Sequence, residues 1–281
     1  MLRAEQEDTI SEIKSTDVIM VQENQTMQDA IFHMVANKIS KIFVNNGQKP
    51  VGVISDKDII RFLYIDRSKR KLDEIYASEI MNQICFVVDT MTCKQAAQMM
   101  MINKISSLGI GSKDRLEGIV TKSDLINYFV ATDPGTSKVS DYMTVSFFAA
   151  PHHSKIHEIL KKMITCDISR VVVTDNNNPL GIITNGDIFR TSLATDKLSI
   201  VHDSNYSDDD GLWSESGFVG AQITGEIMTE GLITIPSNYT MRDAAKLLLD
   251  EKIDSIGVQK DGEMIGILNK SNVLHALADL K

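Results

Sequence analysis

Three segments of the chain share a glycine, two apolar residues, a Ser or Thr and, three residues later, an Asp. They run from Gly52 to Asp58, from Gly118 to Asp124 and from Gly181 to Asp187. The apolar pair is typical of a strand. The Ser or Thr is typical of the first residue of a helix, whose free backbone N–H groups and dipole attract an anion. A hydroxyl there can donate to a phosphate oxygen, and a carboxylate one turn further on can accept from two vicinal hydroxyl groups, such as those of a ribose.

The candidate phosphate donors are Ser55, Thr121 and Thr184, and the candidate ribose acceptors are Asp58, Asp124 and Asp187. The glycine would let the strand approach the sugar closely. The same Ser/Thr-x-x-Asp spacing also resembles a capping box, which satisfies the start of a helix with no ligand present. The two interpretations are compatible, because an Asp that caps the helix in the free protein can turn to a ribose on binding.

A fourth segment, from Gly266 to Asn272, departs from this pattern. Asn269 takes the place of the hydroxyl residue, and Asn272 takes the place of the carboxylate. An Asn side chain accepts through one oxygen only, so it would hold paired hydroxyl groups less well. We expect this degenerate fourth site to be weak or empty.

The segments recur because the chain is built of four similar units. Each unit opens with a short acidic motif, continues with a β-rich stretch and an amphipathic helix, and ends with two strands and a final helix. An isoleucine at the end of the first helix precedes the motif glycine by 13 residues every time, at Ile39 and Gly52, Ile105 and Gly118, Ile168 and Gly181, and Ile253 and Gly266. A spacing held four times indicates an internal repeat.

The composition narrows the classes of function. The 281 residues carry a formal net charge of −9, which disfavours a nucleic-acid binder with a broad basic face. No apolar run approaches the ~18 residues needed to cross a bilayer, and the N-terminus has no apolar core of a secretory signal. The three cysteines, Cys85, Cys93 and Cys166, are typical of reduced thiols. We therefore expect a cytoplasmic protein with neither a membrane nor a nucleic-acid partner.

The repeat resembles the cystathionine-β-synthase (CBS) domain family. The family's opening motif, [D/E]-I-M-T, is matched at Glu79–Asn82, Asp141–Thr144 and Glu226–Thr229. Its closing motif, G-h-h-[T/S]-x-x-D with h apolar, is matched by the three segments described first. The resemblance implies an α+β fold of β-α-β-β-α units, paired into two Bateman modules that pack into a disc. The disc could form within one chain or between two copies of it, as a homodimer.

The resemblance also implies the domain boundaries. The first module would span residues 1–133, with repeats at about 10–66 and 77–130. The second would span residues 134–281, with repeats at about 137–193 and 222–279 and a long acidic excursion at about 194–221.

Further site residues follow from family position. In the energy-sensing γ subunit of AMP-activated protein kinase, a basic residue two positions after the helix-end isoleucine contacts phosphate. That position is Lys41 in the first module and Arg170 in the second. An adenine base would be flanked by Ile39, Val53, Ile105, Ile119, Ile168 and Ile182, with Thr144 and Thr229 at its edge. Ordinary core packing is the alternative for each base-flanking residue, and a solvated charge at the start of a strand is the alternative for Lys41 and Arg170.

Family members often bind adenosine-containing ligands between paired repeats. We therefore predict a regulatory protein that binds AMP, ADP or ATP, with or without Mg²⁺, and relays occupancy to a partner protein through module packing. One alternative is a binder of S-adenosylmethionine or a cyclic dinucleotide, and another is a ligand-free interaction scaffold. The repeats leave no room for a catalytic domain, so we expect no enzyme activity. The cluster of His152, His153 and His157 has no evident third ligand nearby, so we expect no metal site.

Overall fold

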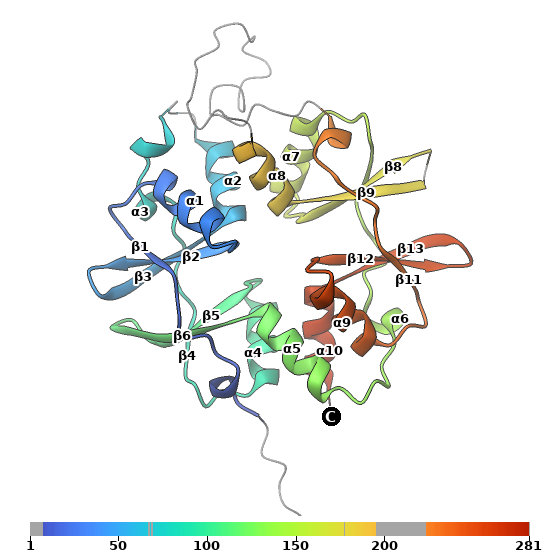
Figure 1. Ribbon diagram of the computed structural model, residues 1–281, viewed down its shortest axis with the longest axis horizontal. Helices are drawn as coiled ribbons and strands as arrows, with labels where there is room; N and C mark the ends of the chain where they lie inside the picture. Colours follow the sequence, from blue (N-terminus) through green and yellow to red (C-terminus); the bar gives the residue numbers. More distant parts are fainter. Residues whose placement is uncertain (1–7, 67, 69, 177, 195–222, 281) are drawn as a thin grey trace, which may run out of the picture.

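The computed structural model describes residues 8–66, 68, 70–176, 178–194 and 223–280. Its four repeats surround a common centre, with the strand hairpins pointing outward and helices packed between the repeats (Figure 1). All four repeats come from one chain, so the disc is completed without a second copy. The acidic excursion predicted at about 194–221 lies, apart from Ala194, outside the described residues.

Each repeat has the predicted order of strand, helix, hairpin and helix. The first repeat contains β1 (Met20–Gln22), α1 (Met27–Ala36), β2 (Lys41–Asn46), β3 (Lys49–Ser55) and α2 (Asp56–Ile65). The second contains β4 (Phe86–Val87), α4 (Cys93–Ile102), β5 (Ser107–Ser112), β6 (Arg115–Thr121) and α5 (Lys122–Thr132). The third contains β7 (Ala149–Pro151), α7 (Ile156–Thr165), β8 (Arg170–Asp175), β9 (Asn178–Thr184) and α8 (Asn185–Ala194). The fourth contains β10 (Thr229–Glu230), β11 (Thr234–Pro236), α9 (Met241–Asp250), β12 (Ser255–Lys260), β13 (Glu263–Asn269) and α10 (Lys270–Asp279).

Single helical turns open the repeats and one more turn lies between the first two. They are η1 (Ile10–Glu12), η2 (Leu72–Glu74), α3 (Ala77–Ile80), α6 (Val139–Tyr142) and η3 (Thr224–Glu226). In each repeat's sheet, the first strand runs parallel to the second, and the third folds back antiparallel. All four hairpins carry a register shift at the equivalent position. The repeated spacing of 13 residues therefore corresponds to one hairpin geometry used four times.

The helix-end isoleucines have a local structural role. The residue before each of them has a left-handed backbone, with φ of 54–55° at Lys38, Lys104, Asp167 and Lys252. The backbone N–H of each isoleucine then donates to the carbonyl five residues earlier, as Ile39 does to Met34 at 2.9 Å. This is the Schellman ending, which favours an apolar residue at the isoleucine position. It turns the chain from the helix into the hairpin.

The segment after each opening motif crosses to the partner repeat. Backbone bridges join Asn82 to Val53, Ser15 to Ile119, Thr144 to Ile267 and Thr229 to Ile182. Repeats 1 and 2 are thus paired, and so are repeats 3 and 4, which confirms the two Bateman modules.

The motif glycines make room for this crossing. A Cβ added at Gly118 would lie 2.9 Å from the carbonyl oxygen of Ser15, and one at Gly266 would lie 2.9 Å from that of Thr144. Real Cβ atoms do not approach backbone so closely, so any other residue would push the crossing segment away. At Gly118, Gly181 and Gly266 the close neighbour is the backbone of the partner repeat, and at Gly52 it is the Met81 side chain. That the glycine also brings the strand close to a sugar stays a prediction.

Two hydrophobic cores cross from one module to the other. One joins repeats 1 and 3, where α2 packs against α8 and where Ile60 and Ile188 are both buried. The other joins repeats 2 and 4, where α10 packs against α4 and α5, and α5 packs against α9. Each module therefore completes its cores with the other module.

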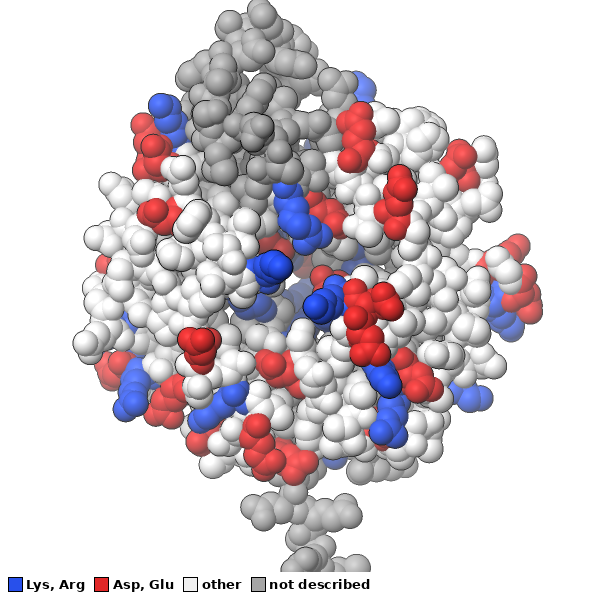
Figure 2. Space-filling view, in the orientation of Figure 1, with Lys and Arg blue, Asp and Glu red and all other residues white. Residues whose placement is uncertain are grey.

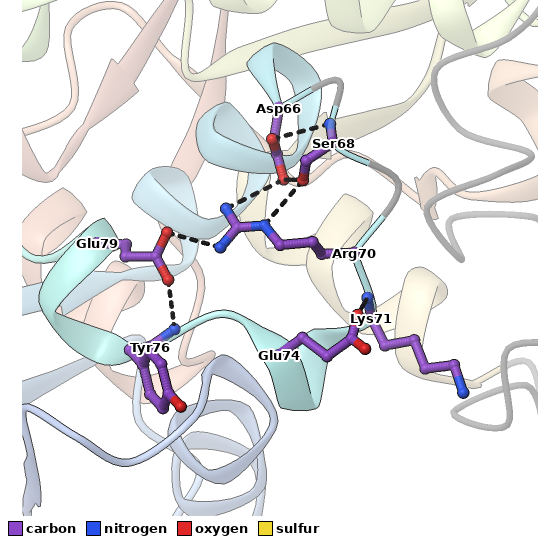
Figure 3. Close-up of polar contacts among 7 residues, drawn as sticks. All are labelled: Asp66, Ser68, Arg70, Lys71, Glu74, Tyr76 and Glu79. Atoms are coloured by element: carbon purple, nitrogen blue, oxygen red, sulfur yellow. Dashed lines mark hydrogen bonds and ion pairs between the residues drawn. The ribbon is translucent and has the colours of Figure 1, made fainter.

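An ion-pair network stabilises the connection between the first two repeats (Figure 3). The guanidinium of Arg70 lies 2.8 Å from a carboxylate oxygen of Glu79 and 3.7 Å from one of Asp66. Partial burial alone would raise the pKa of Asp66, but hydrogen bonds from Ser68 and the charge of Arg70 outweigh it and hold that pKa below its usual value. A hydrogen bond from the backbone N–H of Tyr76, followed by Arg70, lowers the pKa of Glu79.

Replacing Arg70 with Met is expected to lower the Tm slightly at neutral pH, because an ion pair between partly exposed side chains is lost. Both carboxyl groups have folded pKa values below their ordinary values of 3.8 and 4.5. Their contribution is therefore full above those values and is lost as the pH falls through the lower folded values. Thermal unfolding of both proteins from about pH 7 to about pH 3 measures this. A stability difference that stays constant over that range would contradict the assignment.

Within the described residues, none of the helices has the length and apolar character needed to span a bilayer. Cys85, Cys93 and Cys166 are free thiols, as expected. Burial raises the pKa of Cys93 to about 12 and also raises that of Cys85. Because a thiol reacts as its thiolate, the raised pKa disfavours reaction of these two cysteines near neutral pH.

Candidate functional site

The larger of two hollows near the disc centre, with a volume of about 1120 Å³, contains the first motif. Val53, Ser55 and Asp58 of repeat 1 line it, and Ile105 of repeat 2 lines it from the other side. We call it the larger hollow. It places the N-terminus of α2 and the Asp58 carboxylate beside two apolar side chains, which is the arrangement a nucleoside needs.

The Asp58 carboxylate uses one of its two oxygens to cap α2. Oδ2 accepts from the backbone N–H of Ser55 at 2.8 Å and from its hydroxyl at 2.5 Å. Among the described residues, Oδ1 accepts no hydrogen bond. The predicted capping box is present, and it leaves one carboxylate oxygen available to a ligand. The Ser55 hydroxyl hydrogen, which was predicted to reach a phosphate, points to Asp58 in this state.

A second, smaller hollow of about 430 Å³ contains part of the second motif. Ile119 and Thr121 of repeat 2 line it, together with Ile39 of repeat 1. Asp124 lines neither hollow. Its Oδ2 accepts from the backbone N–H and the hydroxyl of Thr121, both at 2.7 Å, so it repeats the capping geometry of Asp58.

The third motif is only partly open: Thr184 lines the smaller hollow, whereas Asp187 is enclosed by the protein itself. Asp187 is only 7% exposed. Its Oδ2 caps α8 by accepting from Thr184, while its Oδ1 accepts from the Thr229 hydroxyl at 2.9 Å and from the Arg190 guanidinium at 2.8 Å. Ile182 is buried under β10, which pairs with it through Thr229. None of Asp187, Ile182 and Thr229 lines either hollow, so the predicted ribose contact at Asp187 has no free oxygen here.

The degenerate fourth motif faces the first across the larger hollow. Thr144, Ile168, Ile267, Asn269 and Asn272 all line it. The Asn272 amide donates to the Tyr142 carbonyl at 2.8 Å and to the Thr144 hydroxyl at 3.2 Å, so its donors are already used within the module. That the fourth site is weak stays a prediction.

The predicted base-flanking residues meet across repeats, not within them. Ile105 of repeat 2 shares the larger hollow with Val53 of repeat 1, whereas Ile39 of repeat 1 shares the smaller hollow with Ile119 of repeat 2. Residue spacing within one repeat could not reveal that these side chains meet across two repeats. They meet because each opening segment crosses to its partner repeat.

Basic side chains gather around the hollow at the centre of the face in Figure 2. Both predicted phosphate binders, Lys41 and Arg170, line the larger and the smaller hollow. Among the other lysines that line the hollows, Lys122 lies in both and Lys270 lies in the smaller one. We call these four residues the central cations. Lys122 and Lys270 are the first residues of α5 and α10, and each directly follows the Thr or Asn of its motif. A lysine at that position of the motif could have identified both residues from the sequence.

Burial and neighbouring positive charges lower the pKa values of two of the central cations, Lys41 and Lys122. Burial lowers the pKa of Lys41 to about 8, with Asp56 opposing the shift and Lys122 and Lys270 adding to it. Burial lowers the pKa of Lys122 to about 8 as well, and Arg170 adds to that shift. Burial in turn raises the pKa of Asp56 to about 6. The site therefore holds an excess of positive charge that the protein only partly neutralises.

Comparison with known proteins agrees with this architecture. Uncharacterized protein MJ1404 of Methanocaldococcus jannaschii is 23% identical over 277 residues, which cover 97% of this chain and 62% of that protein. The chloroplastic CBS domain-containing protein CBSX2 of Arabidopsis thaliana is 26% identical over 169 residues, covering 55% of this chain and 69% of its own. A CBSX2 structure in complex with AMP aligns with 52% of this chain and 99% of that chain at 23% identity, with a TM-score of 0.41.

The crystal structure of MJ1225, also from M. jannaschii, superposes on 96% of this chain and 100% of its own with a TM-score of 0.83 and 18% identity. The family model of the CBS domain matches residues 10–65, 77–131, 139–194 and 224–279. Each match coincides with one of the four β-α-β-β-α units of the disc. The chain therefore belongs to the CBS domain family.

Proposed function

We propose that this protein is a regulatory binder of adenine nucleotides, AMP, ADP or ATP with or without Mg²⁺, and that it has no catalytic activity. The ligand occupies the larger hollow, with its ribose on Asp58 and its phosphates toward Lys41 and Arg170. The observation that carries the proposal is the Asp58 carboxylate, which caps α2 with one oxygen and leaves the other without a partner among the described residues. Val53 and Ile105 flank the base, and the N-terminus of α2 adds its dipole.

Both modules line the larger hollow, which suggests how occupancy is relayed. Asp58 belongs to the first module, while Ile168 and Asn272 belong to the second. A ligand there contacts both modules and shifts their packing by its differential affinity for two arrangements. A regulated protein would sense that shift in the cytoplasm. We place the boundary between the modules at residues 133 and 134, where α5 has ended.

A thermal-shift screen of the full chain tests the proposal, with AMP, ADP, ATP, ATP with Mg²⁺, S-adenosylmethionine and cyclic di-AMP as probes. A ligand at 100 times its Kd adds about 2.7 kcal/mol per site. That should raise the Tm by about 5–10 °C for a chain of this size. A shift with an adenine nucleotide supports the proposal, and a shift only with S-adenosylmethionine or the cyclic dinucleotide replaces the ligand. If no probe shifts the Tm, the motifs are helix caps and the protein is an interaction scaffold.

A further inference from the structure

Asp56 lies in the wall that the two hollows share. It is the first residue of α2, and among the described residues it is the one acidic residue that lines both hollows. Three of the central cations, Lys41, Lys122 and Arg170, also line both. The carboxylate of Asp56 therefore offsets part of their positive charge before any ligand binds.

Backbone contacts hold Asp56 beside Lys41. Lys41 is the register partner of Ser55 in the β2–β3 hairpin, and the backbone N–H of Asp56 donates to the carbonyl of Ser40 at 3.1 Å. Oδ1 of Asp56 accepts from the backbone N–H of Lys57 at 2.7 Å. Among the described residues, Oδ2 accepts no hydrogen bond and no cation lies within ion-pair distance of Asp56. The backbone thus fixes the place of the carboxylate, while one of its oxygens has no partner.

The other three repeats carry no acid at this position. The first residue of the final helix is Lys122 in repeat 2, Asn185 in repeat 3 and Lys270 in repeat 4. A negative charge at the start of a helix is favourable, but these three helices begin without one at this position. The start of α2 therefore does not require the Asp56 carboxylate, and an amide fits the same position in repeat 3.

Asp56 changes its charge close to neutral pH. Burial raises its pKa to about 6, opposed by the hydrogen bond from the Lys57 backbone and by the charge of Lys41, whereas Asp254 and Asp58 add to the shift. The other three central cations line the smaller hollow with it, from α5, β8 and α10. A protonated Asp56 is neutral, so the positive charge of the shared wall grows as the pH falls through that value.

We propose that Asp56 is an internal counter-anion that competes with the phosphates of a bound nucleotide, so that the affinity for nucleotide falls as the pH rises toward neutral. This inference rests on the proposed function, because it needs a phosphate near Lys41. In the free protein the ionised carboxylate offsets the cations, and a bound phosphate takes over that task. An ionised Asp56 then repels the ligand, which favours its protonated form. Nucleotide binding is therefore accompanied by the uptake of a proton.

Calorimetric titration of the full chain with AMP, at about pH 5 and about pH 7, compares the wild type with Asp56→Asn. At the higher pH the variant should bind about five- to tenfold more tightly. By linkage, a bound phosphate that raises the proton affinity of Asp56 about tenfold or more produces a gain of this size. At the lower pH the two proteins should bind alike, because Asp56 is then mostly neutral. The phosphate of AMP titrates in the same range, but its effect cancels when both proteins bind the same ligand at one pH.

Proton uptake on binding is a readout that a merely structural role would not change. Calorimetry in two buffers with different enthalpies of ionisation, at about pH 7, should show that the wild type takes up about half a proton more than Asp56→Asn. Asp56→Glu keeps the charge and should keep the pH dependence. Asp17→Asn is the matched control, because Asp17 also lines the smaller hollow but is exposed, and it should behave as the wild type does.

Equal or weaker AMP binding by Asp56→Asn at both pH values would overturn the role of Asp56 and leave the proposed function standing. A gain of the same size at both pH values would also overturn it, because the charge of the carboxylate would not be its cause. If neither protein binds an adenine nucleotide at either pH, the proposed function fails and the role of Asp56 fails with it. The Tm of the free variant, compared with that of the wild type, shows that the protein remains folded.

Discussion

Asp58→Asn is expected to weaken AMP and ATP binding by about 10- to 100-fold, while the Tm of the free protein stays close to that of the wild type. A hydrogen bond to a charged group contributes about 1.5–3 kcal/mol, which corresponds to that range of affinity. Asp58 lines the larger hollow and its carboxylate has an oxygen with no hydrogen-bond partner among the described residues, and Asn replaces the carboxylate with a neutral amide. Calorimetry with AMP measures the loss directly.

The fourth repeat shows why this substitution should leave the fold intact. Asn272 holds the position equivalent to Asp58, and its side-chain oxygen accepts from the backbone N–H of Asn269 at 2.8 Å. The cap therefore survives with an amide, so lost binding cannot be attributed to a frayed α2. Asp58→Ala would remove the cap as well and would not separate the two effects.

A comparison of AMP with 2′-deoxy-AMP makes the assignment specific to the ribose. The wild type should prefer AMP, because only AMP offers both hydroxyl groups to Asp58. Asp58→Asn should abolish most of that preference, which is the coupling that a double-mutant cycle measures. A variant that binds both ligands more weakly but keeps the same preference would place the ribose elsewhere.

Asp187→Asn is the matched control for the nucleotide site. Both oxygens of Asp187 are engaged inside the protein, by Thr184 on one side and by Thr229 and Arg190 on the other. We expect the variant to bind nucleotide as the wild type does and to melt at a lower temperature, because the ion pair with Arg190 is lost. If Asp187→Asn loses binding and Asp58→Asn retains it, the ligand binds at the third motif and not at the first.

The repeat architecture could be predicted because it depends on interactions between residues that are close together in the sequence. The left-handed turn before Ile39 and its Schellman bond need only neighbouring residues, as does the capping box of Ser55 and Asp58. These local patterns recur four times at constant spacing, so the secondary structure predicted for one repeat is supported by the other three. The order of strand, helix, hairpin and helix in every repeat follows from them.

The state of each site depended on residues far apart in the chain. Asp187 and Asp58 look equivalent in the sequence, but the hydroxyl that closes Asp187 comes from Thr229, 42 positions away. The motif glycine has the same ambiguity, because its spacing fits a sugar or a backbone neighbour equally well. The crossing of the opening segments between repeats, as Ser15 crosses to Ile119, supplies the backbone neighbour, and the spacing alone could not reveal it.

Phe129→Ala is expected to lower the free energy of unfolding by about 3–5 kcal/mol, the usual cost of a large cavity in a buried core. Phe129 lies in α5 of the first module and is fully buried in the core shared with α9 and α10 of the second. The Tm should fall by about 6–20 °C for a chain of this size. Phe32→Ala is the matched control, since Phe32 is 67% exposed and its loss should change stability by less than about 0.5 kcal/mol.

The Phe129→Ala substitution should also destabilise the second module. Because repeats 2 and 4 share one core, a cavity made in the first module removes contacts from the second. Amide hydrogen exchange should therefore accelerate in α9 and α10 as well as in α5, and unfolding should remain a single transition. Faster exchange confined to residues before 134 would mean that the modules unfold independently. In that case ligand-driven changes in module packing would have no shared core through which to act, and the relay proposed from the larger hollow would fail with it.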